Sequence, residues 1–190
     1  MVKLGIGLLL WWLAHSFKRV FPAMRRDLAK TLGEGATKGL VSLALLAALV
    51  LIVIGYRQAP IIALYAPLPG MGHVNNLLML IALFAIGIGP AGGRLAARFR
   101  HPMLWSVVIW AVSHLLVNGD LASVVMFGSL GLWALVQVRL INQHEGPWER
   151  PMPGNALQDY KLALSALFGF VVIAGIHWLF GFNPFLGSYG

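Results

Sequence analysis

The chain contains no cysteine among its 190 residues. This absence excludes structural disulfides, thiolate metal sites, cysteine nucleophiles and covalently attached c-type haem. Any transition metal would have to be held by histidine, methionine or oxygen ligands. Charge is scarce as well, since Asp, Glu, Lys and Arg make up 11% of the sequence while 59% is hydrophobic. So few polar residues cannot cover a water-soluble globule, and the composition therefore predicts an integral membrane protein.

Apolar runs about as long as a bilayer is thick recur along the chain. They predict an all-α fold, a polytopic membrane helix bundle with about six transmembrane helices, in a single domain over residues 1–190. The expected spans are residues 3–19, 38–56, 73–91, 102–117, 121–138 and 160–180. The pattern of residues 20–37 is typical either of an amphipathic surface helix or of an ordinary connector. Residues 57–72 hold three prolines and two glycines and are expected to form an irregular loop, lying on the bilayer surface or over the bundle as a lid.

The formal net charge of +8 does not indicate a nucleic-acid partner, because the basic residues lie between the apolar runs. They are better explained as topological anchors and contacts to the lipid bilayer. The first, third and fifth loops carry 12 of the 14 basic residues, and Lys3 and Arg57 lie on the other side. The positive-inside rule then predicts a multi-pass protein of the bacterial inner (cytoplasmic) membrane with both termini in the periplasm.

Two histidines are expected near the middle of the membrane, where an ionisable side chain is costly and needs a partner. His15 would lie ~18 Å below the outer edge and His114 ~18–20 Å above the inner edge. In a core of ~30 Å, their depths differ by only ~6–8 Å. The two imidazoles could hold the iron of a haem b from facing helices. Alternatively, each imidazole hydrogen-bonds a neighbouring helix and stabilises the bundle, and the residues alone leave the two interpretations even.

Neighbouring side chains could complete such a haem site. Apolar walls would come from Trp11 and Trp110, with Leu8 and Val107. Cations that the propionates could reach are Lys18 and Arg19. His101 cannot share a metal with His114, because thirteen residues on one helix turn it roughly 140° away.

The other polar residues at the ends of spans have structural explanations. A capping or loop hydrogen bond is favoured for His73, and Asp120 is expected to cap the helix that follows the Asn118-Gly119 turn. His144 is expected to be solvated, and His177 to lie at the membrane interface beside an aromatic residue.

Several motifs resemble those of the NnrU family of bacterial membrane proteins: the dipeptide His15-Ser16, LGEGATKGLVSL at 32–43, RHP at 100–102 and WAVSHLLVNGDLAS at 110–123. The similarity covers at least residues 1–140 in order. It implies a protein linked to denitrification, which supports nitrite and nitric oxide reduction, so that components of the denitrification reductases are possible partners.

The same superfamily resembles the zeta-carotene isomerase of plants and cyanobacteria, a haem b membrane enzyme. Its motif histidines correspond to His15, His101 and His114, and the similarity implies that His15 and His114 are the axial ligands. That isomerase carries a cysteine three residues before the second ligand, where this chain has Ala111. A cysteine-based ligand switch is therefore absent, which argues against the isomerase mechanism more than against haem binding.

Three hypotheses follow. The first is a haem b protein of nitrogen-oxide metabolism, with a redox, sensing or maturation role. The second is a haem-dependent isomerase whose substrate is an apolar polyene that enters from the bilayer. The third is a metal-free membrane accessory or scaffold protein. A transporter is disfavoured, because no acidic residue lies within an expected span.

Overall fold

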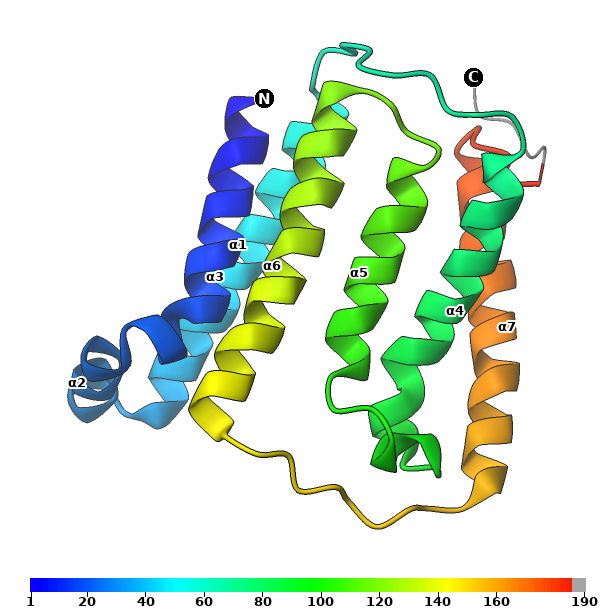
Figure 1. The fold of residues 1–190 in the computed structure, drawn as a ribbon. Coiled ribbons are helices and arrows are strands. Elements are labelled where there is room, and N and C mark those ends of the chain that lie inside the picture. Colours follow the sequence, from blue (N-terminus) through cyan, green and yellow to red (C-terminus); the bar gives the residue numbers. More distant parts are fainter. Residues whose placement is uncertain (186–190) are drawn as a thin grey trace. The chain divides into compact units, whose positions relative to one another are not determined.

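Helices account for the fold of residues 1–185, the part of the chain that the computed structural model describes (Figure 1). In chain order they are α1 (Val2–Val20), α2 (Pro22–Leu32), α3 (Glu34–Arg57), α4 (Met71–Ala91), the 3₁₀ turn η1 (Leu95–Ala97), α5 (Pro102–Leu115), α6 (Leu121–Glu145) and α7 (Ala156–Leu179). Four of them, α3, α4, α6 and α7, are 21 to 25 residues long and apolar enough to cross a membrane. At 1.5 Å per residue they reach ~31–38 Å, against ~30 Å of hydrocarbon. The predicted polytopic helix bundle is therefore confirmed.

Every expected span coincides with a helix, but two of the helices are less typical membrane spans. The 19 residues of α1 include Lys3, Lys18 and Arg19 near its ends, and the 14 residues of α5 extend only ~21 Å. The helix α6 covers the expected span of residues 121–138 and continues beyond it to Glu145. Hydropathy marks where a helix leaves the bilayer and not where its backbone stops. The helix ends only at Gly146, whose φ of 69° lies in the region that favours glycine.

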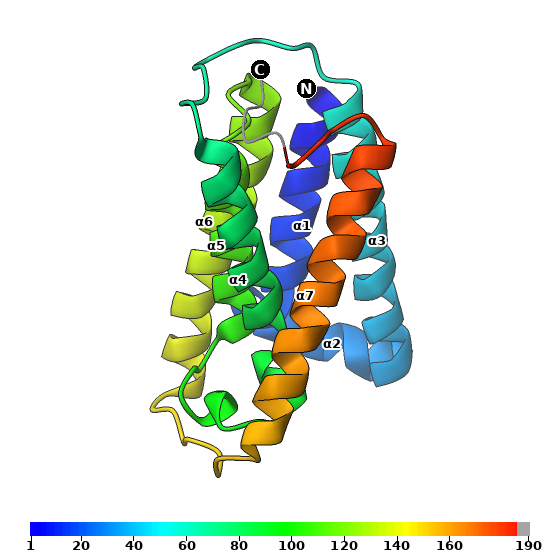
Figure 2. The same cartoon turned by 90° about the vertical axis from the view of Figure 1, so that its right-hand side faces the viewer.

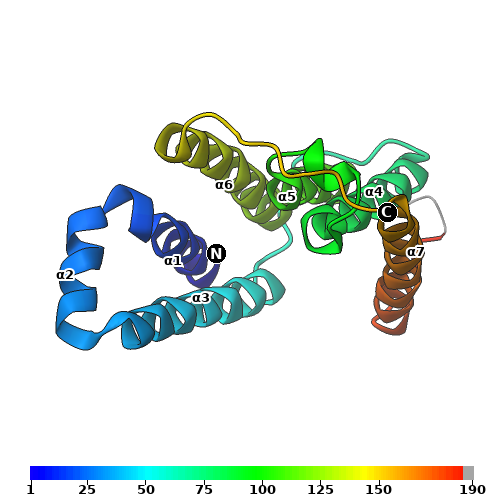
Figure 3. The ribbon, with the colours of Figure 1, turned by 90° about the horizontal axis from the view of Figure 1, so that it is seen from below.

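The chain forms two compact units, Met1–Ile62 and Ala63–Gly190. In the first unit, α1 packs along α3, and the short helix α2 connects them across one end, as the view from below shows (Figure 3). The helical form predicted as one alternative for residues 20–37 is confirmed over Pro22–Leu32, a segment with no buried residue.

Glycine allows α1 and α3 to approach closely. A Cβ atom added at Gly55 of α3 would stand 2.7 Å from the Cα of Leu4 and 2.8 Å from the carbonyl carbon of Lys3. One at Gly7 of α1 would stand 2.8 Å from the backbone nitrogen of Ile52. The two backbones therefore meet where these side chains are missing, as is common between membrane helices.

In the second unit, α5 lies between α4 and α6, and α7 packs on α4 (Figures 1 and 2). Ala85 and Ile88 of α4 form a buried cluster with Leu162 of α7. The loop charges also predict a periplasmic C-terminus, but the last residue lies outside the described part of the chain.

Residues 58–70 form the expected irregular loop. Within the second unit, the loop is fastened to the turn between α5 and α6. The backbone nitrogens of Leu64 and Tyr65 donate to the carbonyl of Gly119 at 2.8 and 3.1 Å, and Ala63 and Asp120 form an antiparallel bridge. The loop thus holds the end of α5, the helix that carries His114.

Candidate functional site

His114 lies in the last turn of α5 with its ring packed among aromatic side chains. The ring stacks on Phe127 of α6, with centroids 4.6 Å apart and planes 23° apart. Trp110, one turn earlier on α5, lies 5.2 Å from the His114 ring and meets Phe127 edge-on at 4.9 Å. These three residues, His114, Trp110 and Phe127, form the aromatic cluster of the second unit.

A backbone carbonyl determines the tautomer of His114. Its Nδ1 lies 2.9 Å from the carbonyl oxygen of Trp110. Because a carbonyl oxygen can only accept, Nδ1 carries the proton, and in the neutral imidazole Nε2 carries the lone pair. A histidine that binds a metal through Nε2 commonly has its other ring nitrogen held in this way.

The imidazole of His114 does not link two helices by hydrogen bonds. Its polar contacts are with Trp110 and Ser113, both on α5, and within residues 1–185 no hydrogen bond reaches Nε2. This observation weakens the structural interpretation, in which the imidazole hydrogen-bonds a neighbouring helix. It leaves Nε2 available as a ligand atom.

The last turn of α5 is held by side chains from outside the helix. The Tyr65 hydroxyl lies 2.9 Å from the carbonyl oxygen of Asn118 and also contacts that of Leu115. The Asn118 side chain donates to the carbonyl of His114 at 2.8 Å. These bonds satisfy carbonyls that a helix end leaves without partners, and they steady the turn that bears His114.

Asp120 begins α6 as its N-cap, as predicted. Its carboxylate accepts from the backbone nitrogen of Ser123 at 3.0 Å and from the Ser123 hydroxyl. Its role is therefore structural. Sequence reasoning missed Tyr65, and its only signal was an aromatic residue with a hydroxyl in a proline-rich loop.

His15 shows the same local arrangement in the first unit. Its Nδ1 donates to the carbonyl of Trp11 at 3.1 Å, and the two rings lie 4.3 Å apart. Each unit therefore carries a tryptophan and, one turn later, a half-buried histidine in the same tautomer. The pairing of His15 with His114 stays a prediction.

The bond to the preceding turn is not by itself a sign of function. His144 donates to the carbonyl of Leu140 and His177 to that of Ile173, each at 2.8 Å, yet both side chains are exposed at helix ends. What distinguishes His15 and His114 is the adjoining tryptophan and their partial burial within apolar stretches. His144 and His177 therefore serve as natural controls for His15 and His114.

Two further histidines have no place in this arrangement. His101 precedes α5, and its Nε2 lies 2.8 Å from Oδ1 of Asn142 on α6, at the other end of the helix from His114. The capping role predicted for His73 is wrong, because α4 starts after Gly70 and has no side-chain cap.

The remaining predicted site residues lie at the end of α1. Lys18 is exposed and Arg19 is half-buried, in the last turn before α2. In the described part of the chain, no group of three or more His, Cys, Asp or Glu residues gathers to hold a metal ion. The candidates therefore do not form a multi-ligand site of the zinc type, which needs at least three protein ligands.

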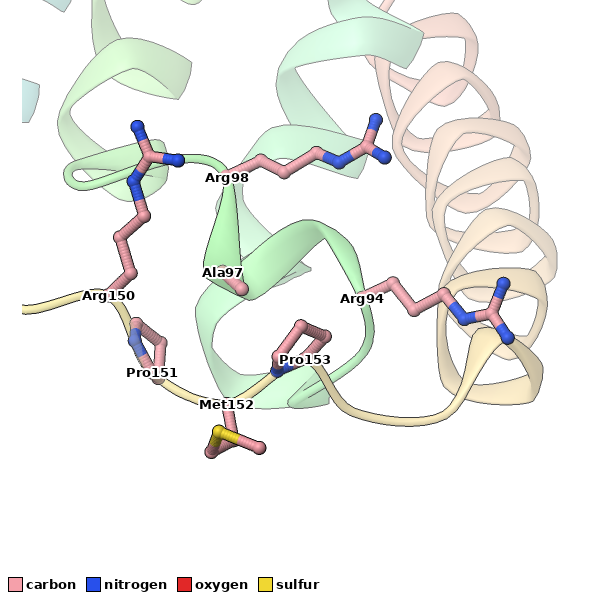
Figure 4. A pocket seen from close by; sticks show the side chains of 7 residues that line it. All are labelled: Arg94, Ala97, Arg98, Arg150, Pro151, Met152 and Pro153. Carbon is pink, nitrogen blue, oxygen red and sulfur yellow. The ribbon is translucent and has the colours of Figure 1, made fainter.

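A hollow of about 460 Å³ lies at the arginine-rich end of the second unit, between the segment after α4 and the segment before α7. It is lined by segments around η1 and residues 150–153, including Arg94, Arg98 and Arg150 (Figure 4). The side chains of Arg94 and Arg98 extend to the same side in this view and that of Arg150 extends upward, so the three guanidinium groups do not converge on a common ligand position. This hollow therefore makes a poor anion site.

The sequence model of one protein family, described as NnrU protein, matches residues 3–184 and so spans both units. No curated protein and no solved structure matches the chain.

Proposed function

The chain belongs to the NnrU family, and we propose that it binds haem b through the imidazoles of His15 and His114. The observation that carries the proposal is the state of His114. Its Nδ1 proton is held by the Trp110 carbonyl, its ring is packed on aromatic side chains, and its Nε2 has no hydrogen-bond partner in the described part of the chain. His15 has the matching tautomer and tryptophan.

When bound, haem supplies one-electron redox chemistry, and the protein's residues set its surroundings. The backbone carbonyls of Trp11 and Trp110 orient the imidazoles, and the tryptophan and Phe127 rings exclude water. Lys18 and Arg19 are the cations that we assign to the propionates. His15 and His114 would hold the haem iron, and the chemistry that the haem would supply is electron transfer.

For the biological role we propose nitrogen-oxide metabolism, in which the protein acts as a redox, sensing or maturation factor together with components of the denitrification reductases. This part rests on the family alone. The loop charges support a location in the bacterial inner membrane with both termini in the periplasm. The carotenoid isomerase alternative gains no support, because neither the 460 Å³ hollow nor one of 260 Å³ in the first unit is lined by either histidine.

An absorption spectrum of the purified protein, oxidised and then reduced with dithionite, tests the proposal. We expect a Soret band and, on reduction, sharp α and β bands of low-spin haem. His15→Ala and His114→Ala should each abolish the low-spin spectrum. His144→Ala is the matched control, since that residue makes the same backbone bond from an exposed position.

Two results would contradict the proposal. One is a protein that stays colourless after reconstitution with haem, which leaves the metal-free accessory or scaffold role. The other is an unchanged low-spin spectrum in His114→Ala, which requires a different ligand.

A further inference from the structure

The first unit contains a hollow of about 260 Å³ among its three helices. All the residues that line it are apolar, among them Leu13 and Phe17 of α1, Leu28 of α2, and Leu40 and Ala44 of α3. A water-sized group occupies about 30 Å³, so the hollow has room for roughly eight such groups in a row or cluster. It offers no hydrogen-bond partner to a polar ligand, and its chemistry fits a hydrocarbon chain.

The helix α2, which connects α1 and α3 at one end of the unit (Figure 3), contributes Leu28 to the lining of this hollow. An ion pair holds α2 to the start of α3, since Arg25 donates to both carboxylate oxygens of Glu34 at 2.7 and 2.6 Å. A short basic helix without buried residues is typical of the membrane surface. The hollow therefore lies next to the level at which lipid headgroups are found.

Cations surround the same end of the unit. The two acids there are already engaged, Glu34 by Arg25 and Asp27 by Lys30 at 3.5 Å. Lys38 and Lys18 also interact electrostatically with the Glu34 carboxylate.

Three cations of this region, Lys18, Lys38 and Arg26, form no ion pair within the part of the chain that the structure describes. Two of them share a helix face with the lining of the hollow, since Ala14 lies four residues before Lys18 and Val41 three residues after Lys38. An apolar slot thus adjoins an excess of positive charge.

We propose that the first unit binds one anionic phospholipid of the bilayer, with an acyl chain in the hollow and the headgroup phosphate against Lys18 and Lys38. The hollow accounts for binding of the acyl chain, and the cations account for the choice of an anionic over a zwitterionic headgroup. In a bilayer or micelle the acyl chain moves from one apolar medium to another, so the slot contributes through packing. Each cation at an anionic surface changes affinity about fivefold.

Native mass spectrometry of the full chain in detergent, titrated with phosphatidylglycerol or phosphatidylcholine of the same acyl length, tests this site. We expect one phosphatidylglycerol per chain, bound at least about tenfold more tightly than phosphatidylcholine, from two or more cations at fivefold each. Ala44→Phe places a phenyl ring in the slot, and the resulting overpacking should weaken binding about tenfold. Ala47→Phe, on the exposed face of the same helix, should leave it unchanged.

A second variant keeps the test valid if Ala44→Phe folds poorly. Lys38→Gln leaves the slot intact and should weaken phosphatidylglycerol about fivefold without affecting phosphatidylcholine. Equal affinity for the two lipids, or full retention of phosphatidylglycerol by Ala44→Phe, would overturn the proposal. So would release of the lipid by millimolar inorganic phosphate, because the site would then recognise free phosphate. None of these results depends on the haem spectrum.

Discussion

A methyl group added at Gly55 should separate the two long helices of the first unit. In Gly55→Ala, the new Cβ would stand 2.7 Å from the Cα of Leu4, closer than Cβ atoms come to other heavy atoms. Leu4 contributes backbone atoms to this contact, so no change of rotamer relieves it, and α1 must move away from α3. Overpacking costs typically 1–3 kcal/mol, and we expect about 3 here. The higher helix propensity of alanine returns about 1, which leaves a loss of about 2 kcal/mol in the free energy of unfolding.

Gly39→Ala is the matched control, because it makes the same substitution on the same helix. A Cβ at Gly39 would meet no atom within 4 Å. Only the propensity term remains, so this variant should be about 1 kcal/mol more stable than the parent. The two variants are thus expected to differ by about 3 kcal/mol and to fall on opposite sides of the parent protein.

Unfolding of the detergent-solubilised protein with increasing SDS, followed by tryptophan fluorescence and far-UV circular dichroism, measures both changes. The midpoint should fall for Gly55→Ala and rise for Gly39→Ala. If Gly55→Ala is as stable as Gly39→Ala, the close approach of α1 and α3 is wrong, and with it the packing of the helix that carries His15.

Three further predictions concern a loop contact, a helix cap and an ion pair. Tyr65→Phe removes the hydroxyl that bonds the end of α5 and should cost about 1 kcal/mol in thermal unfolding. Burial and the nearby Asp120 raise the pKa of Tyr65. The stability that Tyr65 contributes should therefore be complete below the ordinary phenol pKa and be lost as the pH rises through the raised value. Thermal melts of Tyr65→Phe at alkaline pH should not show this loss. Asp120→Ala should cost about 1 kcal/mol as a lost N-cap, and a melting temperature equal to that of the parent would refute the cap. Glu34→Gln should speed amide hydrogen exchange in α2, because it releases Arg25. Asp27→Asn should not, because its partner Lys30 is exposed. Equal exchange rates in the two variants would contradict the role of the Arg25–Glu34 ion pair.

The residues that could be predicted from the sequence are those whose structure is decided by near neighbours along the chain. The helices occupy the expected apolar runs because hydropathy and length act locally. Asp120 could be identified as a cap because the capped nitrogen lies three residues away. The helix α6 continues beyond its expected span, since polar residues after 138 continue a helix as well as apolar ones do. The capping role of His73 failed because Gly70, in the left-handed conformation, already begins α4.

The sequence by itself determined that this is a helical membrane protein, that no cysteine chemistry operates in it, and that His15 and His114 are its candidate ligands. These conclusions depend on composition, on the position of each histidine along its own span, and on the family resemblance of the motifs. Only the tertiary structure decided that Gly55 lies against Leu4, that Phe127 stacks on His114, and that Tyr65 holds the end of α5. Such contacts join residues on different segments of the chain, and their energies arise only when packing brings those segments together.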